Sequence, residues 1–297
     1  MANLAPGRVS DRSAAKVVLN ALSFDVEDYF QVQALETVFT RQSWDTCQLR
    51  VERNTNLILE ELDRTNARAT FFVLGWLVAR CPALIRRIAA GGHELASHGF
   101  AHFRVDRQSH QEFREDIRRT RISLEDCAGV AVIGYRAATF SIGPKEAWAF
   151  PILEEEGYRY SSSIYPVRSD LHSHERAPRF AFRPEGTSRL WEFPISTIRL
   201  AGHNLPSGGG GYFRLLPYSL SRAAIRRVNS HDGQPAVFYL HPWELDAQQP
   251  RPSGVPLKSK LRHYLNLNRT QGRLRRLLSD FNWAPIAGVW SHDLAGS

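Results

Sequence analysis

The sequence predicts an α/β fold built on a parallel β-sheet that is closed or nearly closed. Short apolar segments alternate with longer amphipathic ones from residue 17 onward, a pattern typical of repeated strand–helix units. The apolar segments are hydrophobic along nearly their whole length, as expected of strands buried on both faces. The chain has 297 residues, of which 43% are hydrophobic, so it can form a sizeable core.

The expected elements follow this alternation. Strands are expected where short apolar runs occur, at 17–25, 68–75, 93–98, 132–140, 158–164, 190–196 and 235–242. Helices are expected in the longer segments with helical periodicity, at 54–66, 76–92, 109–129, 143–157, 217–230 and 257–280. Asn54 or Thr55 is expected to cap the first helix and Pro151 to bend the fourth. The glycine-rich segment 207–217 is expected to be a loop.

No linker divides the sequence. We expect a flexible polar arm at residues 1–16 and a single domain over 17–297, with a helical extension from about residue 250. The three cysteines form no CxxC pair, so a disulfide framework or a zinc–thiolate site is not expected. The N-terminus lacks the apolar segment of a secretory signal, and no apolar run is long enough to span a bilayer. A cytoplasmic location without a transmembrane segment is therefore expected.

The charge of the chain is basic but dispersed. The formal net charge is +8, and arginines are scattered among acidic residues along the sequence. No recognised nucleic-acid-binding module accompanies this charge, so nucleic acid is not expected to be a partner.

Ionisable residues follow or interrupt four of the expected strands near their ends. They are Asp25, Glu27 and Asp28 after the first strand, His98 and His102 after the third, Arg136 in the fourth and His241 in the seventh. In parallel βα architectures, chemistry collects at the C-terminal ends of the strands. We therefore expect these side chains to form one site.

The histidine pair has the spacing of a metal site. His98 and His102 stand four positions apart, so on one helical turn both imidazoles would lie on one face. Two imidazoles and one carboxylate are typical of a catalytic zinc site with an open position for water. Each piece alone has a simpler interpretation, as solvated histidines and a solvated acidic turn, and their combination favours the metal.

These motifs resemble those of the polysaccharide deacetylases, the NodB-like carbohydrate esterases of family 4. "SFDVED" resembles the family's first motif, usually T-F-D-D, and "SHGFAH" after "GGHE" resembles the second. "RAATF" resembles the third and "LHP" the last, all in the family's order over roughly residues 17–245. "FDVEDYF", "GGGGYFRLLPY" and "HPWELD" are similar to the subgroup associated with exopolysaccharide and exosortase loci. The resemblance implies a distorted (β/α) barrel of about seven parallel strands.

The resemblance also implies roles for single residues. Asp25 would be the general base, held and tuned by Arg136, and His241 would be the general acid. His98 and His102 would bind a divalent metal, which their chemistry suggests is zinc. Expected contacts to the substrate are Leu240, lining the acetyl pocket, and the aromatic residues Phe140, Tyr212 and Trp243.

The sequence departs from the family pattern at two points and leaves a third open. Val26 stands where the family's metal-binding aspartate normally follows the base, so the carboxylate ligand must be Glu27 or Asp28. An extended chain would place Glu27 on the same face as Asp25, whereas a helix would place Asp28 there. Aspartate is the family's usual ligand, so Asp28 is preferred. Ala138 replaces the usual proline of the third motif. The acid that pairs with the catalytic histidine is not identified, and Glu192 is the nearest candidate.

The expected function is a metal-dependent hydrolase acting on an N-acetylated polysaccharide or its precursor. It would remove acetyl groups from N-acetylhexosamine units and release acetate. One alternative is an amidohydrolase acting on a small non-sugar amide, as in the allantoinase-like relatives of this fold. Another is an inactive glycan-binding protein. Metal binding and a hydrolysis assay would separate the three.

Overall fold

We describe the protein from a computed structural model. The structure describes residues 18–168 and 174–296. The flexible arm expected at residues 1–16 lies outside the described residues.

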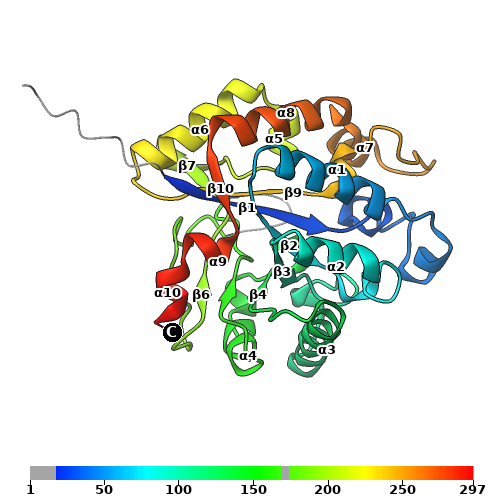
Figure 1. The fold of residues 1–297 in the computed structure, drawn as a ribbon, viewed down its shortest axis with the longest axis horizontal. Coiled ribbons are helices and arrows are strands. Elements are labelled where there is room, and N and C mark those ends of the chain that lie inside the picture. The colour runs from blue at the N-terminus through cyan, green and yellow to red at the C-terminus, as the bar shows by residue number, and fades with distance from the viewer. Residues whose placement is uncertain (1–17, 169–173, 297) are drawn as a thin grey trace, which may run out of the picture.

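The core of the molecule is a curled sheet of eight strands in which every paired neighbour is parallel (Figure 1). Its order is β10-β1-β2-β3-β4-β5-β6, and β9 also pairs with β1. The expected distorted (β/α) barrel is confirmed. The strands are β1 (Leu19–Val26), β2 (Thr70–Val73), β3 (Glu94–Ser97), β4 (Gly134–Tyr135), β5 (Tyr160–Ser161), β6 (Trp191–Glu192), β9 (Val237–Leu240) and β10 (Asn282–Ala284). A separate hairpin of β7 (Thr197–Leu200) and β8 (His203–Pro206) was not expected from the sequence.

Helices surround this sheet, as Figure 1 shows. They are α1 (Val51–Arg64), α2 (Pro82–Ala90), α3 (His110–Ala128), α4 (Ala149–Glu155), α5 (Gly210–Leu215), α6 (Tyr218–Ser230), α7 (Leu257–Tyr264), α8 (Leu267–Asp280), α9 (Ile286–Val289) and α10 (Ser291–Ala295). Pro151 lies in the first turn of α4, where the missing N–H has no helical partner to lose, so the expected bend is not needed.

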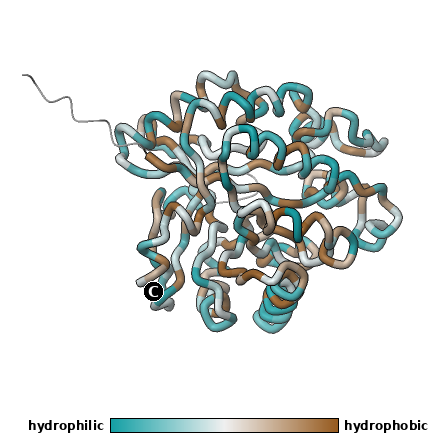
Figure 2. The backbone as a smooth tube through the Cα atoms, viewed as in Figure 1, coloured by the Kyte–Doolittle hydropathy of each residue, from teal (hydrophilic) through white to brown (hydrophobic). Residues whose placement is uncertain are grey.

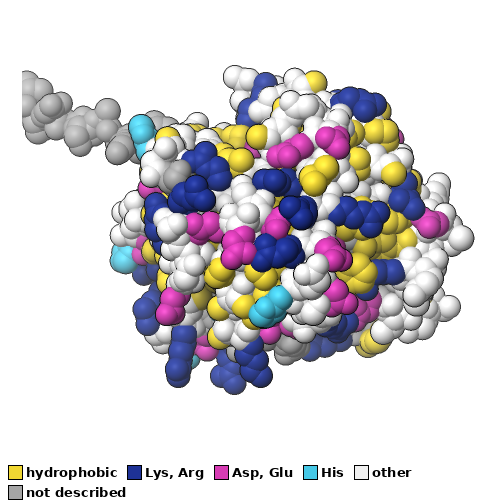
Figure 3. All heavy atoms as spheres, turned by 90° about the horizontal axis from the view of Figure 1, so that it is seen from below, with side chains coloured by type: hydrophobic (Ala, Val, Ile, Leu, Met, Phe, Trp, Pro, Cys, Tyr) yellow, Lys and Arg dark blue, Asp and Glu magenta, His cyan; other side chains and the backbone are white. Residues whose placement is uncertain are grey.

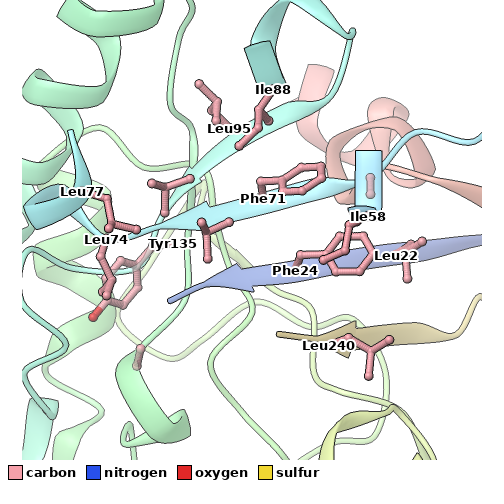
Figure 4. Packing of buried hydrophobic residues seen from close by; sticks show 14 of the residues in the cluster. Leu22, Phe24, Ile58, Phe71, Leu74, Leu77, Ile88, Leu95, Tyr135 and Leu240 are labelled. Carbon is pink, nitrogen blue, oxygen red and sulfur yellow. The ribbon is translucent and has the colours of Figure 1, made fainter. Parts of the chain in front are cut away.

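Strand β1 is the centre of the core. All its residues except Leu19 are buried, and its apolar side chains pack under α1 and against β2. Figure 4 shows Phe24 of β1, Phe71 of β2 and Ile58 of α1 close to one another. The two phenyl rings stack with centroids 5.2 Å apart. Figure 2 shows the same pattern along the chain, with hydrophobic segments concentrated in the strands.

The glycine-rich segment is partly helical, and it bridges the edge of the sheet between β6 and β9. Tyr239 N–H donates to the carbonyl of Gly208 at 2.7 Å. Gly209 has a φ of +113°, and a Cβ there would lie 2.0 Å from the carbonyl oxygen of Tyr239. Only glycine allows such an approach, so a glycine is needed at position 209 for the close contact with β9. The expectation of a loop missed α5, which begins at Gly210.

The surface carries both signs of charge. On the face drawn in Figure 3, Lys and Arg side chains lie among Asp and Glu side chains. Among the described residues, no helix is long and apolar enough to cross a membrane.

Candidate active site

Asp25 and Arg136 form a buried ion pair at the C-terminal edge of the sheet. Asp25 stands next to the end of β1, and Arg136 directly follows β4. Arg136 Nη1 lies 2.6 Å from Asp25 Oδ1, and the two side chains are 0% and 3% exposed. The guanidinium also donates to Ser23 Oγ and to both the hydroxyl and the carbonyl oxygen of Ser162, each at 2.9 Å. These contacts fix the arginine, which in turn fixes the carboxylate.

His241 lies on the other side of Asp25. It directly follows β9, and its Nε2 is 3.8 Å from Asp25 Oδ2. Its Nδ1 lies 2.6 Å from Oε1 of Glu244, three residues later in a 3₁₀ helix. The other Glu244 oxygen accepts from Nε of the buried Arg214 of α5 at 2.5 Å. The chain Arg214–Glu244–His241 therefore holds the imidazole with Nε2 facing Asp25.

Glu27, His98 and His102 form a cluster of potential metal ligands beside these residues. One ligand atom from each lies within 4.8 Å of the others, and all three residues are buried. His102 Nε2 is 3.1 Å from Glu27 Oε2, yet that oxygen accepts no hydrogen bond from the described part of the chain. His98 Nδ1 lies 2.9 Å from the carbonyl oxygen of Arg136. A carbonyl only accepts, so Nδ1 carries the proton and Nε2 keeps its lone pair.

The two histidines lie on a loop, and the expectation of a helical turn was wrong. Gly99 and His102 both have left-handed backbones, with φ of +73° and +53°. The N–H of Phe100 donates to both carboxylate oxygens of Asp116 on α3, at 3.1 and 3.0 Å. The loop brings the centroids of the His98 and His102 rings to 5.2 Å. The two imidazoles thus come together through a loop rather than through the expected helical turn.

Arg41 holds the far end of this loop. Its guanidinium donates to the carbonyls of Ala101 and His102, both at 2.8 Å. It also lies 4.0 Å from the centroid of the Phe103 ring, a cation–π distance. A left-handed backbone is unfavourable for a residue other than glycine, so these contacts stabilise the conformation that His102 needs.

Asp28 is occupied elsewhere, contrary to the preference for it as the metal ligand. Its Oδ1 accepts from the N–H of Tyr29 at 2.8 Å. Its Oδ2 accepts from the N–H of Arg50 at 2.6 Å and from that of Val51 at 2.8 Å. Both oxygens therefore serve backbone donors, two of them at the start of α1, where four donors lack intrahelical partners. This also explains why neither Asn54 nor Thr55 caps the helix, which begins at Val51.

The extended course of β1 selects Glu27 instead. The strand continues to Val26, which points into the apolar core and is fully buried. Alternation along the strand then places Asp25 and Glu27 on the same side. Glu27 is thus the residue that the extended alternative favoured.

Burial sets the charge state of this site. It lowers the pKa of His98, and together with the neighbouring His98 it lowers the pKa of His102 well below its usual range. Both imidazoles are therefore neutral, which is the form that binds metal. Burial also lowers the pKa of His241, but the hydrogen bond to Glu244 and the nearby carboxylates outweigh it and raise the pKa to about 9. The two kinds of histidine thus differ in protonation at neutral pH.

The residues expected to contact substrate occupy different environments. Leu240 is fully buried in β9, and Phe140 is 6% exposed with its ring centroid 5.6 Å from the guanidinium carbon of Arg136. Tyr212 is 38% exposed on α5 and is the most accessible of the four. Trp243 is only 4% exposed, and its indole N–H donates to Glu27 Oε1 at 3.2 Å. The hydrogen-bond partner of the Trp243 indole is therefore the Glu27 carboxylate of the site.

Glu244 was missed by the sequence reasoning, which considered Glu192. Glu192 is fully buried, and its Oε1 accepts from the backbone N–H groups of Ser163 and Ile164, at 2.9 and 2.8 Å. It therefore supports the loop after β5. The available signal was the spacing of His241 and Glu244 in "HPWE", since residues three apart in a helical turn can contact each other.

Comparison with known families is consistent with this geometry. Residues 40–160 match the family described as polysaccharide deacetylase. This match covers less than half of the chain, and Asp25 and Glu27 lie outside it. Residues 162–291 match a second family, described as a domain of unknown function (DUF3473). Of the residues above, His98, His102 and Arg136 lie in the first segment, and Arg214, His241 and Glu244 in the second.

Relatives with named activities match part of this chain. A peptidoglycan-N-acetylglucosamine deacetylase of Listeria monocytogenes is 39% identical over 72 residues, which are 24% of this chain and 16% of that protein. A chitooligosaccharide deacetylase of a Bradyrhizobium strain is 30% identical over 92 residues, which are 31% of this chain and 42% of that protein. The matches thus span less than half the length of either relative.

One solved structure shares the fold over nearly the whole length of both chains. It is a Mycobacterium smegmatis protein assigned as a polysaccharide deacetylase, with a TM-score of 0.61 and 20% identity. The alignment covers 99% of this chain and 96% of the other. At this identity the similarity supports the fold alone.

Proposed function

We propose that this chain is a metal-dependent hydrolase that removes N-acetyl groups from N-acetylhexosamine units of a polysaccharide or its precursor. The observation that supports this most directly is the position of three groups at one edge of the sheet. The Glu27–His98–His102 cluster lies beside a carboxylate held by an arginine, and beside a histidine held by a carboxylate. The relatives named above act on peptidoglycan N-acetylglucosamine and on chitooligosaccharide, which supports the class of substrate.

The residues of the cluster fit a divalent ion. Glu27 Oε2 is buried and accepts no hydrogen bond from any described residue, although it faces His102 Nε2. The proton on His98 Nδ1 leaves Nε2 available, and a carbonyl partner on the other ring nitrogen is typical of metal-binding histidines. Two neutral imidazoles and one carboxylate match zinc. A zinc ion held there would polarise the acetyl carbonyl and lower the pKa of the attacking water.

Asp25 is placed to act as the general base. Arg136 fixes one of its oxygens at 2.6 Å, and the other, Oδ2, faces His241. As the water oxygen attacks the acetyl carbon, Asp25 would take the proton that the water loses.

His241 is placed to act as the general acid. Its Nδ1 is bonded to Glu244, so Nε2, which lies 3.3 Å from Glu27 Oε1, is the nitrogen that would donate a proton to the amide nitrogen as the carbon–nitrogen bond breaks. The raised pKa of about 9 keeps this ring protonated at neutral pH. The products are acetate and a free amine on the sugar.

The proposal is tested by acetate release from N-acetylglucosamine oligomers. The protein would be stripped with a chelator and assayed before and after addition of zinc. We expect release only with zinc, and none from His98→Ala or Asp25→Asn. Asp25→Asn should still bind zinc, because the base is not part of the cluster. His203→Ala is the matched control, since that histidine is exposed on β8 and should leave release unchanged. Release by the stripped protein, or by His98→Ala, would contradict the proposal.

A further inference from the structure

The carboxylate of Glu27 needs an orienting partner. Glu27 stands two residues beyond Asp25, and its side chain is one methylene longer than the aspartate that usually follows the base. The extra rotatable bond gives the carboxylate more orientations to lose when it binds an ion. A residue that holds one oxygen would aim the other at the histidines.

Trp243 provides this contact. Its indole N–H donates to Glu27 Oε1 at 3.2 Å, and Oε2 is the oxygen that lies 3.1 Å from His102. Oε1 therefore faces the tryptophan and also His241 Nε2, which lies 3.3 Å away, whereas Oε2 faces the cluster. Trp243 precedes Glu244 in the same 3₁₀ helix and comes from a part of the chain 216 residues away from Glu27.

The indole is held between two histidine rings. Its ring centroid lies 5.1 Å from that of His241, with 27° between the planes. On the other face His263 of α7 stacks at 4.3 Å and 14°. His263 Nε2 is bonded to Gln249 Oε1 at 2.6 Å, and the Gln249 amide donates to the carbonyl of Trp243 at 2.9 Å. This closed set of contacts leaves the indole little freedom to rotate.

Arg214 attaches the stack to the rest of the fold. It donates to the carbonyls of His263 and Leu265 at 2.9 Å, while its Nε contacts Glu244. It is 2% exposed. The buried Arg214 thus holds both Glu244, which is the partner of the general acid His241, and the backbone of His263, whose ring stacks on the indole.

We propose that Trp243 is a positioning residue for the metal, which orients Glu27 so that its Oε2 completes the cluster with His98 and His102. The stack and its supports all lie in residues 162–291, the segment whose family has no assigned function. We thus assign that segment a role in the metal centre of the deacetylase, although both histidine ligands lie in the other segment. The inference rests on the proposed function only in requiring that the cluster binds a metal.

Zinc affinity of the full chain is the direct test. It would be measured by competition with a chelating indicator for the wild type, Trp243→Phe and Trp283→Phe. Phenylalanine keeps an aromatic ring and removes the N–H, so we expect affinity to fall 10- to 100-fold, as is usual for partners of metal ligands. Trp283→Phe is the matched control, because that buried indole donates to the carbonyl of Leu277 at 3.0 Å, outside the site. It should leave zinc affinity unchanged.

A second background separates orientation from simple structural damage. In Glu27→Gln the two histidines still bind zinc weakly and the tryptophan has no carboxylate to orient, so adding Trp243→Phe should cause little further loss of that weaker affinity. An equal loss in both backgrounds would overturn the inference, and so would wild-type affinity in Trp243→Phe. If Trp243→Phe folds poorly, benzothienylalanine at position 243 removes the N–H and keeps the shape, with the same expected loss. If wild-type protein does not bind zinc, the proposed function fails and the inference falls with it.

Discussion

Glu27 and Asp28 are adjacent acidic residues, and exchanging them for neutral ones should have opposite effects. Glu27→Gln should abolish tight zinc binding and leave the metal-free fold intact. Asp28→Ala should destabilise the fold and leave the zinc ligands in place. The reason is that Glu27 faces two histidines, whereas Asp28 faces three backbone N–H groups.

The expected loss of stability in Asp28→Ala follows from those bonds. Loss of a helix-capping side chain costs about 0.5–2 kcal/mol, and a buried backbone donor left without a partner costs about 1–3 kcal/mol. Because ionised Asp28 itself suffers from burial, part of this cost is offset, and its pKa is raised to about 6. We therefore expect a decrease of about 2–4 kcal/mol in the free energy of unfolding. Glu27→Gln should change it by less than about 1 kcal/mol, because the amide oxygen can still accept from Trp243.

Urea unfolding of the metal-free proteins and zinc titration of the folded ones would measure both effects. The expected pattern is loss of zinc binding without loss of stability for Glu27→Gln, and the reverse for Asp28→Ala. Zinc binding that survives in Glu27→Gln and disappears in folded Asp28→Ala would refute the assignment. It would show that the chain leaves the extended conformation of β1 before Glu27, as the helical alternative required.

Three further predictions follow from buried contacts. Arg41→Met should weaken zinc binding about tenfold in a zinc titration, because His102 loses the donors that hold its left-handed backbone; unchanged affinity would mean that the loop needs no such support. Arg214→Met should lower the free energy of unfolding, measured in urea, by about 3–5 kcal/mol, since one oxygen of the buried Glu244 and the carbonyls of His263 and Leu265 lose their donor; a loss below about 1 kcal/mol would contradict this. Burial lowers the pKa of His263 to about 3, below that of the unfolded chain, so stability should fall as pH drops from about 6.5 toward 3. His263→Gln should remove a few kcal/mol of that dependence, and an identical pH profile would show that His263 does not titrate there.

Much of the sheet could be predicted because its signals are local. The apolar runs ending at Asp25 and at His241 became β1 and β9, and the alternation correctly indicated a parallel sheet. The hairpin of β7 and β8 was missed because its strands are partly exposed and show no clear apolar run. The start of α1 was missed because its cap, Asp28, is supplied from 22 residues earlier in the chain.

The candidate site, like the fold, could be predicted from the sequence only in part. The sequence by itself determined the residue types and their order, since Asp25, His98, Arg136 and His241 each stand at or near a strand end and parallel strands deliver such ends to one edge. Only the tertiary structure decided between Glu27 and Asp28. That choice depends on which carboxylate accepts from the backbone N–H groups at the start of α1 and which lies beside His102 in the loop after β3. Both partners are remote from residues 27 and 28 in the sequence.

The supports of the site also emerged only from the packing. The local signal for Glu244 was limited to its spacing from His241, and the roles of Glu244 and Trp243 come from contacts with Arg214 and with Glu27 across the fold. Local patterns report how a segment folds, because burial and periodicity are properties of the segment. Hydrogen bonds between distant segments depend on side-chain geometry within a few ångströms, and that geometry exists only once the sheet has formed.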